Sequence, residues 1–360
     1  MEPSGSGPEG TGVETGEGRS EGHRVRWGLV IHGGVGVIPR QKMTEETAAD
    51  YRRVLAESLR AGYGAMADGG SAVEGVVAAI EVMEDSPVFN AGRGSNFTTD
   101  GEVTMDASIM AGEDLAAGAV TGVKRTRNPI RLARTVMEEC PHVMLSGEGA
   151  DAFALERGLK WEDPEFFFTQ RRWDALQEAR AREAEGVDRP NTVDEDDAGT
   201  PGGGAEPSTP GNPDPGEEEA ENLRRGTVGA VALDAGGMLV AGTSTGGSAN
   251  KKWGRIGDSP VIGAGTYAGS HCGVSCTGWG EYFIRHAVAH DIQARMALAG
   301  RSLTEATREV VMEKLQAHRP GLGGVVAMDR RGNLEMVYNT QGMYRGWVDE
   351  RGKVRVAIFE

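Results

Sequence analysis

One peptide bond in this sequence separates a segment without core-forming residues from a strand that should be buried. Residues 186–226 are rich in Pro, Gly, Asp and Glu, whereas residues 227–234 read Thr-Val-Gly-Ala-Val-Ala-Leu-Asp. Cleavage between Gly226 and Thr227 would give Thr227 both a hydroxyl nucleophile and a free α-amine. The ordinary pKa of an α-amine, about 7.7–8.0, allows it to act as the base that activates the hydroxyl. A Gly-Thr pair alone is more typical of an exposed strand start, so other motifs must decide.

A second pair of side chains has the chemistry of an amino-acid binding site. Arg255 and Asp258 lie three residues apart in a Gly-rich stretch at 255–269. A guanidinium presents a planar fork that matches an α-carboxylate, and a carboxylate complements an α-ammonium group. Taken alone, the pair is more typical of a surface ion pair, which contributes about 0–1 kcal/mol.

Two further polar residues lie in or beside glycine-rich stretches. His32 ends an apolar run and leads into a turn predicted at 33–36. This stretch is not G-x-G-x-x-G, and no acidic residue follows a second strand at the expected distance, so a dinucleotide site is not indicated. His32 is therefore either catalytic or structural. Asn90 lies in an irregular loop at 84–95 and is either a site group or a turn residue.

The net charge of −16 is concentrated outside the predicted core. Residues 1–24 carry five Glu against two Arg, and residues 183–226 carry thirteen acidic residues against three Arg. The remainder is nearly neutral and has no basic stripe, so nucleic-acid binding is not favoured. Three cysteines, at 140, 272 and 276, indicate neither a disulfide framework nor a complete zinc site. Without a signal peptide or an apolar run of about 20 residues, a cytoplasmic protein that binds no membrane is expected.

Hydrophobic periodicity predicts the elements that position these residues. Thr44 and Ser71 are predicted helix N-caps, and Glu74 completes a capping box with Ser71. Helices are predicted at 44–68, 71–82, 128–140, 147–157, 163–185, 304–316 and from the stretch at 277–281 to about 298. Strands are predicted at 27–32, 103–110, 117–123, 227–233, 238–242, 324–328, 334–338, 346–348 and 354–359. This order predicts an α+β fold of two facing sheets with helices outside.

Eight short stretches, taken in order, resemble the plant-type asparaginases and isoaspartyl peptidases, which are N-terminal-nucleophile hydrolases. The stretches are I-H-G-G-V-G at 31–36, F-N-A-G-R-G-S at 89–95, M-D-A-S-I-M at 105–110, G-T-V-G-A-V-A-L-D at 226–234, T-S-T-G-G at 243–247, G-R-I-G-D-S-P at 254–260, G-A-G-T-Y-A at 263–268 and T-G-W-G-E at 277–281. The resemblance covers nearly all of residues 27–350 except the acidic segment before Thr227.

The resemblance implies a four-layer αββα sandwich that is made as an inactive precursor. The precursor would cut itself between Gly226 and Thr227. Thr227 would then be the nucleophile and its α-amine the base. Thr245 is expected to hydrogen-bond near that amine and hydroxyl, and Asn90 is expected to lie near the nucleophile.

The resemblance also implies how a substrate would be held. Thr277 and Gly278 would form the oxyanion hole, where one donor is worth roughly 2.7–4 kcal/mol. Arg255 would bind the α-carboxylate of the substrate. Asp258, with Gly278 and Gly280, would bind its α-ammonium group.

No cofactor is expected for catalysis, but the resemblance implies a structural sodium ion. Backbone carbonyls would bind this ion, namely those of Met83, Glu84, Ser86, Phe89, Ala91 and Arg93. The resemblance further implies a homodimer of processed protomers.

The expected organisation is one catalytic domain in two halves. Residues 1–24 are expected to be a disordered acidic tail, and residues 186–226 a disordered acidic linker that ends at the cleavage site. Residues 25–185 and 227–360 would form the α-subunit and β-subunit halves of that domain.

The expected substrates are β-aspartyl dipeptides first and L-asparagine second, with release of aspartate. Three alternatives remain open. The protein could be a glycosylasparaginase-like amidase or a protein-cleaving endopeptidase of the same superfold. It could also be an uncleaved, non-catalytic scaffold with an acidic interaction tail.

Overall fold

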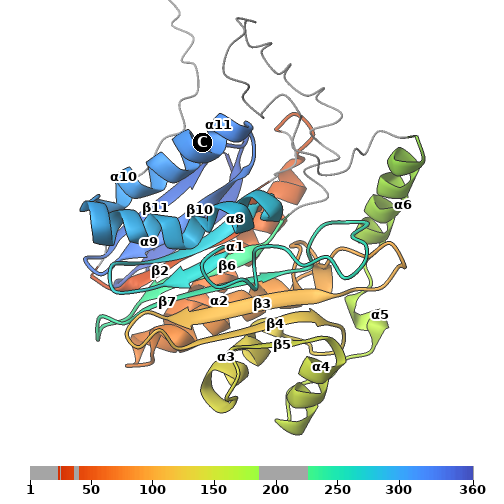
Figure 1. Cartoon of the computed structure of the whole chain (residues 1–360), viewed down its shortest axis with the longest axis horizontal. Coiled ribbons are helices and arrows are strands. Elements are labelled where there is room, and N and C mark those ends of the chain that lie inside the picture. Colours follow the sequence, from red (N-terminus) through yellow and green to blue (C-terminus); the bar gives the residue numbers. More distant parts are fainter. Residues whose placement is uncertain (1–22, 25, 36–39, 186–225, 360) are drawn as a thin grey trace, which may run out of the picture.

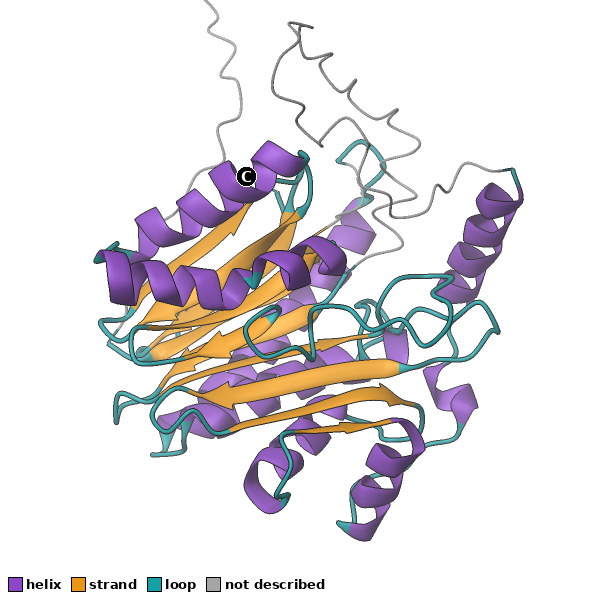
Figure 2. Ribbon diagram, viewed as in Figure 1, coloured by secondary structure: helices purple, strands orange, loops and turns teal. Residues whose placement is uncertain are grey.

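The computed structural model describes residues 23–24, 26–35, 40–185 and 226–359. Within these residues, two β-sheets face each other and helices flank them (Figures 1 and 2). The disordered segments predicted at 1–24 and 186–226 lie almost entirely outside the described residues. The last two residues of the first segment are an exception to the predicted disorder, because His23–Arg24 form a short strand that pairs with a later strand.

The larger sheet has eight strands in the order β13-β12-β2-β6-β7-β3-β4-β5. Neighbouring strands are antiparallel except β4 and β5, which are parallel. The strands are β2 (Gly28–Val35), β3 (Met105–Ala111), β4 (Ala117–Val123), β5 (Met144–Ser146), β6 (Val228–Leu233), β7 (Leu239–Thr245), β12 (Met343–Asp349) and β13 (Val354–Ala357). Strands from before and after Thr227 are therefore interleaved in one sheet.

The smaller sheet has five strands in the order β1-β11-β10-β9-β8. These are β1 (His23–Arg24), β8 (Thr266–Ala268), β9 (Cys272–Gly278), β10 (Gly323–Asp329) and β11 (Asn333–Tyr338). Its strands β8, β9 and β10 pack on β2, β3, β6 and β7 of the larger sheet. An apolar layer fills the space between the sheets, with Val30, Val231, Ala241, Val326 and Met336 among its buried members.

Helices cover the outer faces of both sheets. The larger sheet is covered by α1 (Glu45–Ala67), α2 (Ala72–Asp85) and α3 (Pro129–Glu139), and a short 3-10 turn η1 (Gly92–Gly94) follows α2. Three further helices precede the acidic segment, α4 (Gly147–Glu156), α5 (Pro164–Phe167) and α6 (Gln170–Ala184). The smaller sheet is covered by the helices drawn in blue in Figure 1, α8 (Gly280–His286), α9 (Val288–Ala299), α10 (Leu303–Arg308), the π-helical turn η3 (Glu309–Leu315) and α11 (Gln316–His318).

The predicted helix starts are confirmed. Thr44 caps α1 by accepting a hydrogen bond from Thr47 N, and Ser71 and Glu74 form the capping box of α2. Pro129 occupies the first turn of α3, where its missing N–H costs nothing. Local side-chain chemistry thus sets where the helices behind the larger sheet begin.

Two predicted helices are wrong because each is interrupted. The helix predicted at 163–185 is split into α5 and α6, since Thr169 has an extended backbone and its side chain caps Arg172 N. The helix predicted to run to about 298 is broken at Ala287, which adopts a left-handed conformation with φ of 47°. The result is two shorter helices, α8 and α9, in place of one.

Other differences concern strands with little apolar character. The turn predicted at 33–36 is wrong as far as it is described, because β2 continues through Gly33 and Gly34 to Val35. The strands β8 and β9 were not predicted, because β8 has only three residues and the alternating residues of β9, Cys272, Val274 and Cys276, are small and lie among Gly, Ser and Thr. Both strands contribute to the site described below.

Candidate active site

Thr227 lies one residue before β6, in the middle of the larger sheet. Its side chain is buried, with 6% of the residue exposed. Its hydroxyl donates a 3.1 Å hydrogen bond to Oγ1 of Thr245, the last residue of β7. The β6–β7 hairpin pairs Val228 with Ser244, and this register brings the two threonines side by side.

The carbonyl oxygen of Gly226 receives two hydrogen bonds. Asn90 Nδ2 donates at 2.8 Å, and Thr245 Oγ1 donates at 3.2 Å. Gly226 has φ of 134°, a conformation that favours glycine, and an added Cβ would lie 3.2 Å from the Asn90 side chain. Asn90 is itself fixed, since its second N–H bonds to Gly247 O and its Oδ1 accepts from Asn96 N. Two fixed donors therefore polarise the carbonyl that Thr227 would have to attack.

His32 is a structural residue in this arrangement. Its Nδ1 lies 3.0 Å from the carbonyl oxygen of Thr227, and its Nε2 lies 2.9 Å from Ser275 Oγ. Burial lowers the pKa of His32 to about 3, although the hydrogen bond with the Thr227 carbonyl acts in the opposite direction. Both ring nitrogens are engaged, so neither can take the proton of the Thr227 hydroxyl.

Thr277 and Gly278 are the last two residues of β9, and Gly278 lines the cavity that Thr227 lines. The fully buried Thr277 accepts a 3.2 Å hydrogen bond from Val35 N through its Oγ1, which leaves its own hydroxyl proton available. A Cβ on Gly278 would lie 2.3 Å from the carbonyl oxygen of Leu322, so no side chain fits there. The bond to Val35 ties the end of β9 to the end of β2.

Arg255 is held by Glu281, a residue that did not stand out in the sequence. Its Nε and Nη2 donate to the two carboxylate oxygens of Glu281 at 2.9 and 3.0 Å. This bidentate pair fixes the plane of the guanidinium, while Nη1, which lies near Gly247 and Gly257, is not part of it. The stretch T-G-W-G-E at 277–281 contained the signal, because it places an acidic residue in the first turn of α8.

Asp258 is a buried carboxylate with an unused oxygen. It is 4% exposed, and its Oδ2 has no hydrogen-bond partner among the described residues. Burial raises the pKa of Asp258 to about 7, although nearby Arg255 acts to lower it. A Cβ at Gly280 would lie 3.0 Å from both Asp258 Oδ1 and Arg255 Nη2, so this glycine keeps the space between the two charges open.

Lys251 anchors a turn next to the site, and the sequence did not indicate this role. Its buried Nζ donates to the carbonyl oxygens of Thr104, at 2.7 Å, and Gly246. Burial lowers the pKa of Lys251 to about 8, while the buried carboxylate of Asp106 acts in the opposite direction. Lys251 thus holds the turn at 246–247, to which Asn90 is also bonded.

One small cavity brings most of the predicted site residues together, although Asn90, Thr277 and Gly280 do not line it. It is lined by Gly226, Thr227, Thr245, Arg255, Asp258 and Gly278, among others. Its volume of about 10 Å³ holds at most one water molecule. Gly226 forms part of its wall, so the intact Gly226–Thr227 bond leaves no room for a substrate.

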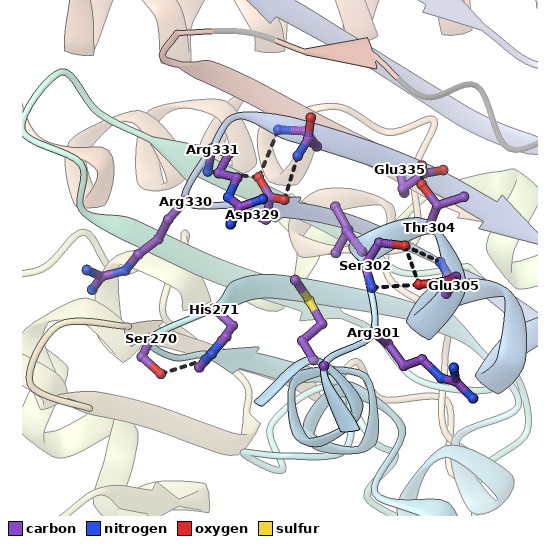
Figure 3. A pocket seen from close by; sticks show the side chains of 14 residues that line it. Ser270, His271, Arg301, Ser302, Thr304, Glu305, Asp329, Arg330, Arg331 and Glu335 are labelled. Carbon is purple, nitrogen blue, oxygen red and sulfur yellow. Dashed lines mark hydrogen bonds between the residues drawn. The ribbon is translucent and has the colours of Figure 1, made fainter. Parts of the chain in front are cut away.

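A second, larger cavity of about 700 Å³ lies between the β10–β11 turn and the start of α10 (Figure 3). Its polar side chains bond to one another, as in the pairs Ser302–Glu305 and Ser270–His271. Figure 3 shows Arg301 and Arg330 pointing apart, so no convergent set of donors faces the cavity. Of these two cavities of the described residues, the small one therefore holds Thr227, Arg255 and Asp258.

Two facing sheets flanked by helices, with a buried polar site where a central strand starts, agree with the N-terminal-nucleophile hydrolase class expected from the sequence. The chain belongs to the asparaginase family, because the family model described as "Asparaginase" matches residues 25–358. The resemblance noted in the sequence is thereby confirmed.

Named relatives agree over most of the chain. The isoaspartyl peptidase of Escherichia coli is 44% identical over 320 residues, which cover 89% of this chain and 92% of the relative. The isoaspartyl peptidase/L-asparaginase of Danio rerio is 35% identical over 92% of this chain and 94% of its own. The plant-type L-asparaginase of Pyrococcus abyssi is 38% identical over 89% of this chain and 96% of its own.

Proposed function

We propose that this protein is a self-processing threonine amidohydrolase that hydrolyses β-aspartyl dipeptides and L-asparagine and releases aspartate. One observation carries the proposal. Thr227 with its hydrogen-bonded hydroxyl, Gly226 with its doubly hydrogen-bonded carbonyl, and Asp258, whose Oδ2 has no partner among the described residues, line a single cavity. The relatives named above support the choice of substrates.

The first reaction is cleavage of the chain by itself. Thr227 Oγ attacks the carbonyl carbon of Gly226, and the oxyanion that forms is stabilised by Asn90 Nδ2 and Thr245 Oγ1. The C–N bond breaks, the amide nitrogen takes the hydroxyl proton, and an ester remains. Water then hydrolyses this ester, which gives a Gly226 carboxylate and a free α-amine on Thr227.

The second reaction uses the same nucleophile on a substrate. The α-amine takes the proton of the Thr227 hydroxyl, and Oγ attacks the β-carbonyl carbon of the aspartyl group. The leaving amine or ammonia departs with a proton, and water hydrolyses the acyl-enzyme to release aspartate. Thr277 and Gly278 would stabilise the oxyanion, because the Thr277 hydroxyl has its proton available.

The substrate would be held by its charged α-groups. The α-ammonium would pair with Asp258 Oδ2, which supplies the partner that this buried oxygen lacks. Arg255 Nη1 would bind the α-carboxylate, since Glu281 already engages Nε and Nη2. Gly280 leaves space for the α-carbon between these two groups.

The finer structural assignments belong to the same proposal. The layers of helix, sheet, sheet and helix would be the αββα sandwich of the N-terminal-nucleophile hydrolases, and two processed protomers would form a homodimer. Among the described residues, no helix is both long and apolar enough to cross a membrane. A cytoplasmic location remains part of the proposal.

The structural sodium ion implied by the resemblance would lie between the end of α2 and η1. Within the described residues, no cluster of His, Cys, Asp or Glu could hold a metal, so backbone carbonyls would have to do so. Cβ atoms on Gly92 and Gly94 would lie 2.3 Å from Glu84 O and 2.0 Å from Phe89 O, which shows how closely these buried carbonyls crowd the loop. The full set of carbonyls would be those of Met83, Glu84, Ser86, Phe89, Ala91 and Arg93. We expect a higher melting temperature in sodium chloride than in choline chloride at equal ionic strength.

The cleavage step is tested by denaturing mass spectrometry of the wild type beside Thr227→Ala. We expect fragments 1–226 and 227–360 from the wild type and an intact chain from the variant. An intact wild-type chain after long incubation would favour the non-catalytic scaffold.

The substrate is tested on the cleaved protein. Release of aspartate from a β-aspartyl dipeptide and from L-asparagine, without hydrolysis of a sugar-linked asparagine, is the expected result. Hydrolysis of the sugar-linked substrate alone would favour the glycosylasparaginase-like alternative.

A further inference from the structure

A row of polar side chains crosses the larger sheet at the level of the nucleophile. His32 on β2 pairs with Gly229 on β6, Gly229 pairs with Thr243 on β7, and Thr243 pairs with Ser108 on β3. The side chains of His32, Thr243 and Ser108 are 0% exposed, although they belong to a layer that is otherwise apolar. Buried polar groups in such a layer need partners.

The partners come from the facing sheet. Thr266 on β8 and Ser275 on β9 are paired in register and are also 0% exposed. Ser275 Oγ lies 2.7 Å from Thr243 Oγ1, and Thr266 Oγ1 lies 2.6 Å from Thr243 Oγ1 and 2.8 Å from Ser108 Oγ. Ser108, Thr266, Thr243 and Ser275, called the hydroxyl chain below, therefore form a continuous path between the two sheets that ends at His32 Nε2.

The histidine fixes the direction of the hydrogen bonds at its end of this path. A carbonyl can only accept, so His32 Nδ1 carries the proton and donates to Thr227 O. A neutral imidazole then has an accepting Nε2, which requires Ser275 to donate. Each hydroxyl has one proton. Ser275 Oγ, at 2.7 Å, is a nearer acceptor for the Thr243 proton than the carbonyl oxygen of Gly265, at 3.1 Å, and Thr266 in turn donates to Thr243. Hydrogen bonds aligned in this way strengthen one another.

Gly229 provides the space for this path. A Cβ at Gly229 would lie 2.0 Å from Ser275 Oγ and 2.5 Å from His32 Nε2. Any side chain there would separate the histidine from the hydroxyl chain. This accounts for a glycine inside the central strand β6, where glycine otherwise weakens a strand.

The far end of the path reaches the substrate-binding loop. Ser108 Oγ lies 2.6 Å from the carbonyl oxygen of Ser259, the residue that follows Asp258. Ser108 has one proton, and both Thr266 Oγ1 and Ser259 O lie within hydrogen-bond distance as acceptors for it, so the path from Thr227 reaches the loop that carries Asp258 through a donor that these two oxygens share. The two ends are the two halves of the proposed active site.

We propose that the hydroxyl chain and His32 are positioning residues that hold Thr227 in register with the substrate-binding loop once the chain has been cut. This inference rests on the proposed function. After cleavage Thr227 is a chain end that lies outside β6, and chain ends fray unless they are tied down. The bond from His32 Nδ1 to the Thr227 carbonyl supplies that tie, and it keeps the hydroxyl and the α-amine aimed at the cavity.

The first test reads the tautomer of His32 without any need for activity. In the full-length protein labelled with ¹⁵N-histidine, the His32 signal is identified by its loss in His32→Asn. We expect a neutral ring protonated at Nδ1 from pH of about 5 to about 9. A ring protonated at Nε2, or one that titrates in this range, would overturn the proposal.

The second test compares two variants at one position. Thr243→Val keeps the shape of the side chain and removes the hydroxyl, whereas Thr243→Ser keeps the hydroxyl. We expect Thr243→Val to lower kcat about tenfold to a hundredfold with KM nearly unchanged, and Thr243→Ser to restore most of kcat. Wild-type kcat in Thr243→Val, or equal losses in both variants, would contradict a role for the hydroxyl.

If Thr243→Val does not fold, the pair Thr266→Val and Thr266→Ser provides the same comparison one link further from Thr227. The outcomes also separate this proposal from the proposed function. A wild type that neither cuts itself nor hydrolyses substrate would refute the function, while the tautomer of His32 would still decide whether the directed path exists.

Discussion

At the scale of single residues, the structure distinguishes donors for cleavage of the chain from donors for hydrolysis of a substrate, which the sequence could not do. Asn90 donates to the Gly226 carbonyl and so serves the cleavage of the chain, whereas Thr277 has its proton available for a later oxyanion. His32 serves neither as base nor as donor to an oxyanion, because both nitrogens are engaged. One nucleophile thus has different partners in its two proposed reactions.

We predict that Asn90→Ala slows self-cleavage by roughly 10²–10³-fold, because one of the two donors to the Gly226 carbonyl is lost. The matched control is Asn96→Ala. Asn96 Nδ2 also bonds to Gly247 O at 2.8 Å, so the control disturbs the same turn and leaves the Gly226 carbonyl untouched. The fraction of cut chain is followed over time by mass spectrometry. Equal slowing in both variants would show that the turn matters and the donor does not.

A second prediction concerns the stability cost of Asp258. Its pKa in the folded protein is raised to about 7 from an ordinary 3.8, so the folded state binds the proton more tightly than the unfolded state. The destabilisation is therefore complete above pH 7 and is relieved as the pH falls toward 4. We expect Asp258→Asn to raise the melting temperature at a pH of about 8 and to have little effect at about 4.

The Asp258 measurement is made in a Thr227→Ala background, which keeps the uncut chain in every sample. A melting temperature unchanged at the higher pH would mean that the buried carboxylate finds compensation in the folded protein. On the cleaved enzyme, the same Asp258→Asn substitution should raise KM strongly, because the substrate ammonium loses its charged partner. A stabilised but weakly binding variant is the pattern expected of a site that sacrifices stability for function.

At the scale of secondary-structure elements, the break between α8 and α9 offers a direct test of backbone strain. Ala287 has φ of 47° and Gly300, at the end of α9, has φ of 68°. The left-handed conformation destabilises the folded state by about 1–2 kcal/mol at a residue with a Cβ. Glycine avoids this strain, but it makes the unfolded chain more flexible, which offsets part of the gain in stability.

We therefore expect Ala287→Gly to raise the free energy of unfolding by about 0.5 kcal/mol and Gly300→Ala to lower it by about 1 kcal/mol. Denaturant titration of the two variants measures both values. Destabilisation by Ala287→Gly would mean that the Ala287 methyl group packs usefully or that the break relaxes to another conformation.

The elements also show how far the sequence could predict the fold. Helix caps at Thr44 and Ser71 and the apolar strands of the larger sheet follow from local chemistry, and both predictions are confirmed. β9 was not predicted, because its alternating buried residues, Cys272, Val274 and Cys276, are small, and its pairing with β8 and β10 is not visible in the sequence. The site shows the same limit. The motifs indicated Thr227, Arg255 and Asp258, but only strand register across two sheets brings the hydroxyl chain together.

At the scale of the whole molecule, the two halves on either side of Thr227 are interleaved. β2 from the first half lies between β12 and β6 of the second half, and β3 lies beside β7. The helix α2 of the first half packs on β6 and β7 of the second half. Cutting one peptide bond therefore removes no strand from its neighbours.

We predict that the cut protein behaves as one cooperative unit. Fragments 1–226 and 227–360 should elute together under native conditions and separate only in denaturant. Calorimetry should give a single transition, because each half supplies hydrogen-bond partners and apolar cover that the other half needs. Fragment 227–360 alone should not fold, since β6 would lose β2 on one side and α2 on one face. Separate elution, or two transitions in the cut protein, would contradict an interleaved sheet and would also leave Thr227 without the fixed surroundings that its chemistry requires.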